Sequence, residues 1–148
     1  MNLRAIFYYT GLFIIPIIFL SLLNILFSSY YNYFLNIDSY IITFFISILL
    51  SSFLIYPGRH CQKEINFLEQ LILTLNIFFF IPLLISIPFY LSNYNITFLN
   101  SYFESVSGFT STGFSIFENI KYLDPTLIIW RSSSQWIGGM YFIFFLIM

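Results

Sequence analysis

Four long apolar runs, separated by short polar stretches, dominate the pattern along the chain. Each is close to the roughly 20 residues with which an α-helix crosses the hydrocarbon core of a bilayer. The runs are Ile6–Phe27, Tyr40–Tyr56, Leu68–Leu91 and Leu127–Met148, the last interrupted only by Arg131 and a short polar stretch. We therefore predict four membrane-crossing helices and an all-α membrane protein.

The first run differs from a signal peptide, whose apolar core has only about 7–15 residues. It contains Pro16 and is followed by several tyrosines, which suit a membrane interface. Proline recurs in the third run at Pro82 and Pro88, where a membrane helix tolerates it if neighbouring groups bind the freed backbone. The second run ends at Pro57-Gly58, which predicts a helix stop.

A shorter apolar segment, Ile96–Ser107, lies between the third and fourth runs. At 1.5 Å per residue, about ten helical residues reach about 15 Å, half of the bilayer core. The S-x-x-E pattern from Ser101 to Glu104 predicts a capping box, and Thr97 is an equally good helix start. The polar stretch Gly108–Ser115 follows. A half-length helix before an extended polar strand is typical of a pore loop.

The residue types of this stretch suit a dehydrated potassium ion, which backbone carbonyl oxygens can coordinate in place of water. Gly113 permits the positive φ that turns carbonyls toward an axis. Ser111 and Thr112 add hydroxyl oxygens without adding charge. The carboxyl end of the short helix carries partial negative charge and would face the cation. The alternative is an outer loop that is merely rich in serine and threonine.

The composition also indicates that the protein is surrounded by a lipid bilayer rather than by water. The chain has 148 residues, of which 59% are hydrophobic and 7% are charged, whereas soluble domains carry about 25% charged residues. The net charge of −1 argues against nucleic-acid binding, which needs a basic groove beside the aromatic residues. His60 and Cys61 are the only histidine and cysteine, too few ligands for a structural zinc site.

The basic residues predict the topology. Arg4 precedes the first run, and Arg59 and Lys63 lie between the second and third. Because basic loops stay in the cytoplasm, the N-terminus is expected inside and Asp38 outside. The segment from 92 to about 126 then begins on the outer side.

Two motifs resemble a known family. Phe103–Gly113 reads F-E-S-V-S-G-F-T-S-T-G and resembles the first pore loop of Trk-type potassium uptake proteins, often F-E-S-V-S-G-F-T-T-T-G. Trp130–Met140 resembles the W-R-x-x-x-Q-W-x-G-G-M of the same family. The resemblance to the Trk/Ktr-type potassium transporter superfamily is clear in the residues of Leu68–Met140. Before Leu68 it lies only in the number and order of the predicted helices. Ser111 is a mild departure, since the family commonly has threonine there.

The resemblance implies a fold and a site. Family members have four repeats of helix, pore loop and helix around one pore, and each repeat supplies one filter strand. Residues 1–64 would form an additional N-terminal helix pair, and residues 65–148 the first repeat, with its last helix cut short. The implied potassium-binding filter consists of Thr110, Ser111, Thr112, Gly113 and Phe114, with the carbonyls of Ser111, Thr112 and Gly113 as ligands.

Four other residues are expected to be structural and near the pore. We expect Arg131 to pair with Glu118 or Asp124 rather than to handle ions directly. Glu104 is expected to cap its helix, the alternative being the attraction of cations. Gly138 and Gly139 are expected to allow a close helix approach, the alternative being a hinge.

The predicted function is potassium uptake across the cytoplasmic membrane, potassium being the substrate, with sodium or proton coupling left open and no cofactor in this chain. The chain holds one repeat and Met148 still lies in an apolar run, so we interpret it as the N-terminal part of a longer protein. The resemblance implies as partners the lipid bilayer, the remaining pore repeats, a second full-length copy in a homodimer, and a cytosolic nucleotide-binding regulatory subunit like TrkA or KtrA.

Two other functions are alternatives to potassium uptake by a longer chain. A small channel subunit could assemble as a tetramer, with four copies supplying four filter strands, but the two additional helices argue against it. An intramembrane enzyme needs a nucleophile beside a positioned base. The only histidine is expected on the cytosolic loop, far from the serines of the pore segment, so we predict that the protein is not an enzyme.

Overall fold

The computed structural model describes residues 3–59 and 65–147, and all its regular elements there are helices. They are α1 (Leu3–Tyr31), α2 (Ile37–Gly58), α3 (Phe67–Tyr90), α4 (Phe98–Phe109), the 3₁₀ turn η1 (Ile120–Tyr122) and α5 (Pro125–Ile147). The predicted cytosolic loop with His60, Cys61 and Lys63 lies outside the described residues. The chain is thus an all-α membrane protein, as the apolar runs predict.

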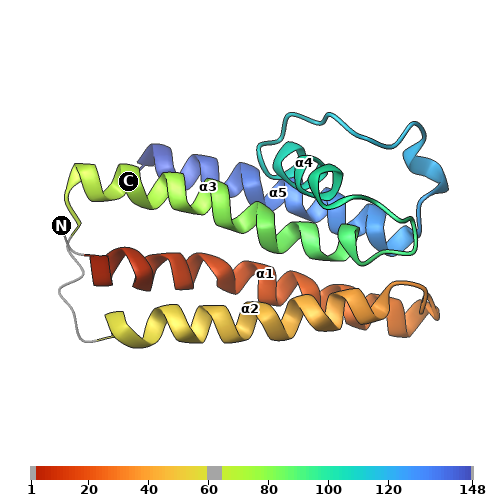
Figure 1. The fold of residues 1–148 in the computed structure, drawn as a ribbon, viewed down its shortest axis with the longest axis horizontal. Coiled ribbons are helices and arrows are strands. Elements are labelled where there is room, and N and C mark those ends of the chain that lie inside the picture. The colour runs from red at the N-terminus through yellow and green to blue at the C-terminus, as the bar shows by residue number, and fades with distance from the viewer. Residues whose placement is uncertain (1–2, 60–64, 148) are drawn as a thin grey trace.

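The long helices run side by side and alternate in direction (Figure 1). In the described part, α1, α2 and α3 are long and apolar enough to cross a membrane. The predicted fourth run forms α5, whose 23 residues are also long enough at 1.5 Å per residue. The polar run Arg131–Gln135 interrupts α5, which is not one of those three apolar helices. Its crossing of the membrane therefore stays a prediction.

Side chains of α5 bind backbone carbonyls close to the prolines of α1 and α3. In α3, the indole N–H of Trp130 donates to the carbonyl of Ile85 at 3.0 Å, close to Pro82 and Pro88. In α1, the hydroxyl of Tyr141 donates to the carbonyl of Phe13, near Pro16. Both donors come from α5, and each binds the carbonyl three residues before a proline, Phe13 before Pro16 and Ile85 before Pro88. These carbonyls are next to those whose helical N–H donors the prolines remove. The predicted stop at Pro57-Gly58 is confirmed, because α2 ends at Gly58.

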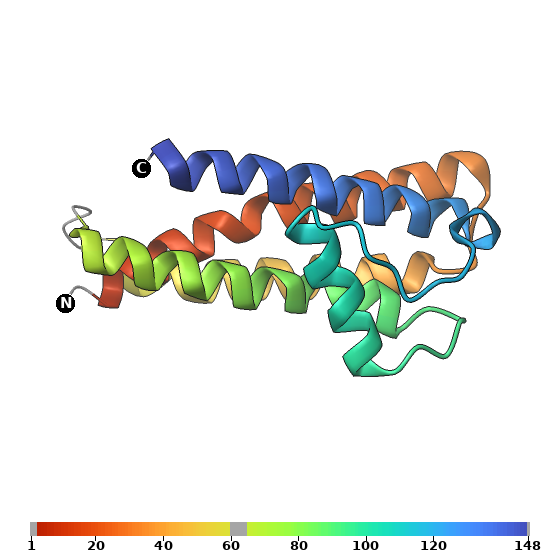
Figure 2. The same cartoon turned by 90° about the horizontal axis from the view of Figure 1, so that it is seen from above.

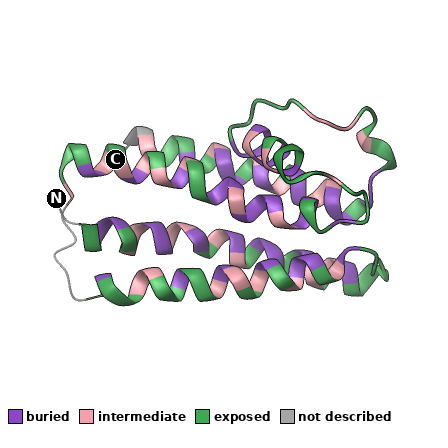
Figure 3. Ribbon diagram, viewed as in Figure 1, coloured by how far each residue is buried: buried purple, intermediate pink, exposed green. Residues whose placement is uncertain are grey.

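Buried side chains lie where the helices face one another, and exposed ones on the outer faces (Figure 3). The largest fully buried side chains include Trp130, Tyr40, Phe89 and Phe109. Trp130 of α5 packs on Tyr40 of α2, with ring centroids 5.6 Å apart. On the outside, large apolar side chains such as Phe53 and Leu75 are about three-quarters exposed and suit contact with lipid.

Candidate functional site

α4 lies obliquely across α3 and α5 rather than parallel to them (Figure 2). Its predicted start at Thr97 is confirmed: the Thr97 hydroxyl accepts from the backbone N–H of Asn100 at 3.4 Å. The capping box predicted from Ser101 to Glu104 is wrong. Ser101 lies inside the helix and donates to the Thr97 carbonyl, while the carboxylate of Glu104 binds residues outside the helix.

The carboxyl end of α4 meets the middle of α5. A Cβ atom at Gly138 would lie 1.7 Å from the carbonyl oxygen of Phe109, the last residue of α4. Gly138 is 13 residues after Pro125, the start of α5, or about 20 Å along its axis. The close approach expected from the paired glycines is therefore confirmed for Gly138, whereas at Gly139 an added Cβ would only touch the Ser111 hydroxyl at 3.8 Å.

The chain turns sharply after α4 and returns to the end of the bundle from which it entered (Figure 1). Two residues of the turn have positive φ, Ser111 at 56° and Gly113 at 82°. The positive φ predicted at Gly113 is thus observed. Ser111 adopts this less favourable conformation while its hydroxyl donates to the carbonyl of Gln135 on α5 at 3.1 Å.

Ser107 holds the turn from the inside. Its backbone carbonyl accepts from the N–H groups of Thr112, at 3.1 Å, and Gly113, at 3.4 Å. Its hydroxyl donates to the carbonyl of Phe114 at 2.6 Å. The five residues Thr110 to Phe114 are nevertheless exposed in this chain, and among the described residues no donor binds the carbonyl oxygens of Ser111 and Thr112.

Glu104 and Arg131 form a buried ion pair that braces this turn. Arg131 Nε lies 2.5 Å from Glu104 Oε1, and the two side chains are 10% and 0% exposed. Glu104 also accepts from the hydroxyl of Ser115, at 3.1 Å, and the backbone N–H of Ile116, at 2.9 Å. One carboxylate on α4 therefore joins the returning chain to α5.

Arg131 completes the brace from the other side. Its Nη2 atom lies 3.4 Å from the carbonyl oxygen of Gly113 and 3.5 Å from that of Phe114. The partners predicted for Arg131, Glu118 and Asp124, are wrong. Glu118 is exposed on the returning loop, and Asp124 lies in a separate network at the end of the bundle. The structural pairing expected of Arg131 is confirmed, but with Glu104.

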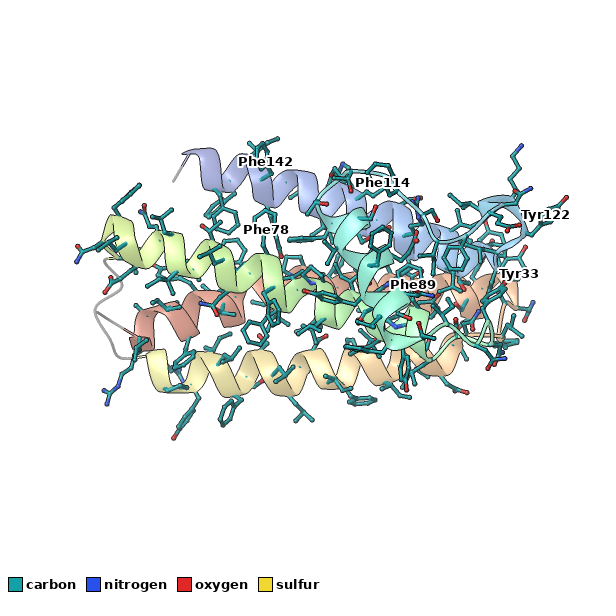
Figure 4. The ribbon with its side chains drawn as sticks, turned by 45° about the horizontal axis from the view of Figure 1, so that its top comes forward. Tyr33, Phe78, Phe89, Phe114, Tyr122 and Phe142 are labelled. Carbon is teal, nitrogen blue, oxygen red and sulfur yellow. The ribbon has the colours of Figure 1, made fainter. Side chains whose placement is uncertain are left out.

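A cavity of about 440 Å³ adjoins the turn on the side toward the chain termini, lined by Phe78, Phe109, Thr110, Ser111, Gly138, Gly139 and Phe142. Two of these residues, Phe78 of α3 and Phe142 of α5, lie nearer the termini than Phe114 (Figure 4). The exposed turn and the cavity are thus continuous.

Asp124 fastens the N-terminal helix pair to the start of α5. Its carboxylate accepts from the Asn36 amide at 2.7 Å and from the backbone N–H of Thr126 at 3.2 Å, which caps α5. Pro125 occupies the first helical position, where its missing N–H costs nothing. The Tyr40 hydroxyl donates to Thr126 at 3.0 Å and extends the network into α2. The pair Asp124-Pro125 is a helix-start signal in the sequence, but no sequence motif indicated the contacts of this network with Asn36 and Tyr40.

We expect Asp124→Ala to lower the free energy of unfolding by about 2 kcal/mol or more, since it removes a helix cap and leaves a buried amide donor of Asn36 unpaired. Thermal unfolding in detergent measures the change. Asp38→Ala, which removes an exposed aspartate from the first turn of α2, is the matched control and should cost less than half as much. Equal losses in the two variants would contradict the assigned role.

Parts of this sequence are similar to known proteins. The sequence model of the TrkH family, described as a cation transport protein, matches residues 36–148. The Trk system potassium uptake protein TrkH of Salmonella typhimurium is 29% identical over 99 residues, which are 66% of this chain and 20% of that protein. No solved structure matches the chain.

Two further relatives match a shorter segment. An uncharacterised cation transporter of Methanocaldococcus jannaschii is 38% identical over 55 residues, 37% of this chain and 12% of that protein. The potassium uptake protein TrkI of Halomonas elongata is 40% identical over 55 residues, 37% of this chain and 11% of that protein. The chain thus covers no more than about a fifth of these relatives. Because the family model matches well over half of its residues, the chain belongs to the TrkH family of cation transport proteins.

Proposed function

We propose that the chain supplies one strand of the selectivity filter of a potassium uptake protein, formed by Thr110–Phe114. The observation that carries the proposal is that Ser111 and Thr112 are exposed residues whose carbonyl oxygens have no donor among the described residues. They lie at the carboxyl end of α4, where the helix dipole favours a cation. Several relatives are named as potassium uptake proteins.

The surroundings favour Ser111 and Thr112 as the principal ligands. The carbonyl of Gly113 also faces the Arg131 guanidinium at 3.4 Å, and that of Phe114 accepts from Ser107. A cation at Gly113 would therefore lie closer to a fixed positive charge than one at Ser111. Glu104, within hydrogen-bond distance of Arg131, partly offsets that charge.

A single strand cannot surround an ion, so the exposed face of Thr110–Phe114 needs neighbours. We propose that further repeats of the same longer protein supply the other strands and that residues 1–64 and 65–148 are the N-terminal helix pair and the first repeat. The N-terminus would lie in the cytoplasm, and α4 would enter from the outer side of the cytoplasmic membrane. A homodimer and a cytosolic nucleotide-binding subunit would complete the system, and sodium or protons would be the candidate coupling ions.

We expect Gly113→Ala in the full-length protein to reduce potassium uptake and its discrimination against sodium. In the part of the chain that the structure describes, a Cβ atom at Gly113 would meet nothing within 4 Å, so the substitution tests backbone conformation and not packing. An L-residue in the left-handed region costs about 1–2 kcal/mol, and Gly113→Asp adds a charge to the same strain. Growth of potassium-uptake-deficient cells at low potassium, with and without excess sodium, measures both properties.

Gly139→Ala is the matched control, because it adds the same methyl group at ordinary contact distance and should support growth. If Gly113→Asp left uptake and selectivity unchanged while the protein accumulated normally, the filter assignment would be wrong.

A further inference from the structure

Two arginines line one cavity at the end of the bundle opposite the returning loop. Arg4 comes from the first turn of α1, and Arg59 immediately follows α2. With Tyr56 and Pro57 they enclose about 590 Å³. Figure 1 shows the start of α1 and the end of α2 next to each other at this end.

The backbone fixes the spacing of the two arginines. A Cβ atom at Gly58 would lie 2.6 Å from the carbonyl oxygen of Arg4 and 2.4 Å from Cβ of Tyr8. The end of α2 therefore packs directly on the first turns of α1, and only glycine permits the approach. This backbone contact places the backbone of Arg59 near that of Arg4, whatever rotamers the two side chains adopt.

Among the residues that the structure describes, no carboxylate neutralises either arginine. Both are exposed, and neither forms an ion pair with a carboxylate of residues 3–59 or 65–147. The opposite end differs in charge: there Asp38 and Glu118 are exposed beside Lys121. The two arginines thus place positive charge around a cavity at one end of the membrane-crossing helices. Basic pockets between such helices bind lipid headgroups.

The geometry points to a binding site for the phosphate of an anionic phospholipid, held by Arg4 and Arg59. The guanidinium groups can each offer two parallel N–H donors to phosphate oxygens. Tyr56, which is 82% exposed, lies at the depth where aromatic rings meet headgroups. A lipid is favoured over free phosphate because the cavity joins the ends of two membrane-crossing helices, where headgroups are concentrated. The site is separate from the proposed ion path.

The test uses the purified full-length protein in detergent. Phosphatidylglycerol, phosphatidylcholine and inorganic phosphate are added separately, and native mass spectrometry together with the thermal unfolding midpoint reports binding. The native protein should retain phosphatidylglycerol and unfold at a higher temperature with it. Arg4→Gln/Arg59→Gln should weaken this retention by about thirtyfold, while Lys121→Gln, at the other end, should leave it unchanged.

The conservative variant Arg4→Lys/Arg59→Lys should retain part of the binding, which separates loss of charge from loss of fold if the glutamine variant aggregates. Retention of phosphatidylglycerol by a folded glutamine variant at the native level would overturn the proposal. Equal stabilisation by phosphatidylcholine would show that the headgroup charge is not recognised, and equal stabilisation by inorganic phosphate would show a soluble ligand; either result overturns the lipid assignment.

Discussion

Glu104→Ala is expected to abolish potassium uptake in the full-length transporter and to lower the free energy of unfolding by about 3–5 kcal/mol. The loss leaves the buried guanidinium of Arg131 without its counter-charge. It also removes the acceptor of the Ser115 hydroxyl and of the Ile116 N–H. Uptake of potassium or rubidium in deficient cells, together with thermal unfolding in detergent, measures the two effects. Glu118→Ala, which removes an exposed carboxylate from the returning loop, should be close to native in both.

A second variant separates folding from the role of the brace. Because a buried ion pair can be replaced by apolar residues without loss of stability, Glu104→Leu/Arg131→Met should recover much of the unfolding free energy. It cannot bind Ser115 and Ile116, so we expect the turn to loosen and discrimination between potassium and sodium to fall. If this double variant unfolded like the native protein and also transported with native selectivity, the brace would have no role in positioning the proposed filter strand.

Gly138→Ala is expected to prevent the protein from accumulating in its folded form. The added Cβ atom would lie 1.7 Å from the carbonyl oxygen and 2.5 Å from the carbonyl carbon of Phe109. These are backbone atoms at the end of α4, so no side chain can rotate away, and α4 must shift along α5. Overpacking of this kind costs about 1–3 kcal/mol and sometimes more, and here it also displaces the turn that starts at Thr110.

The neighbouring glycine provides the control. At Gly139 the one described atom within 4 Å of an added Cβ would be the Ser111 hydroxyl oxygen, at 3.8 Å, so Gly139→Ala should accumulate and transport like the native protein. Fluorescence-detected size-exclusion chromatography measures the folded amount, and ion uptake measures activity. Equal behaviour of the two alanine variants would contradict the assigned contact between Gly138 and α4.

The local features of the site could be predicted from the sequence because each depends on neighbouring residues. The apolar runs gave the positions of α1, α2 and α3 to within a few residues, since length and hydrophobicity suffice for a membrane helix. The positive φ at Gly113 followed from the residue type at the end of a short helix. The start at Thr97 was one of two alternatives, and its side-chain bond to Asn100 decided between them.

The partners of Glu104 and Arg131 could not be predicted in the same way. The S-x-x-E pattern favoured a local bond three residues apart, whereas the ion pair joins residues 27 positions apart. The predicted partners Glu118 and Asp124 lie 13 and 7 positions from Arg131 in the sequence. Asp124 is instead occupied by Asn36 and the start of α5.

The sequence by itself determined that this is a membrane protein and which residues form its long helices. It also determined which segment has the polar, glycine-containing character of an ion-coordinating strand. These properties follow from hydrophobicity and residue type along the chain. Only the tertiary structure decided that Glu104 braces the returning chain and that Gly138, rather than Gly139, contacts α4. Both depend on how α4 lies across α5. That crossing rests on contacts between residues 27 to 29 positions apart, which no local pattern in the sequence reveals.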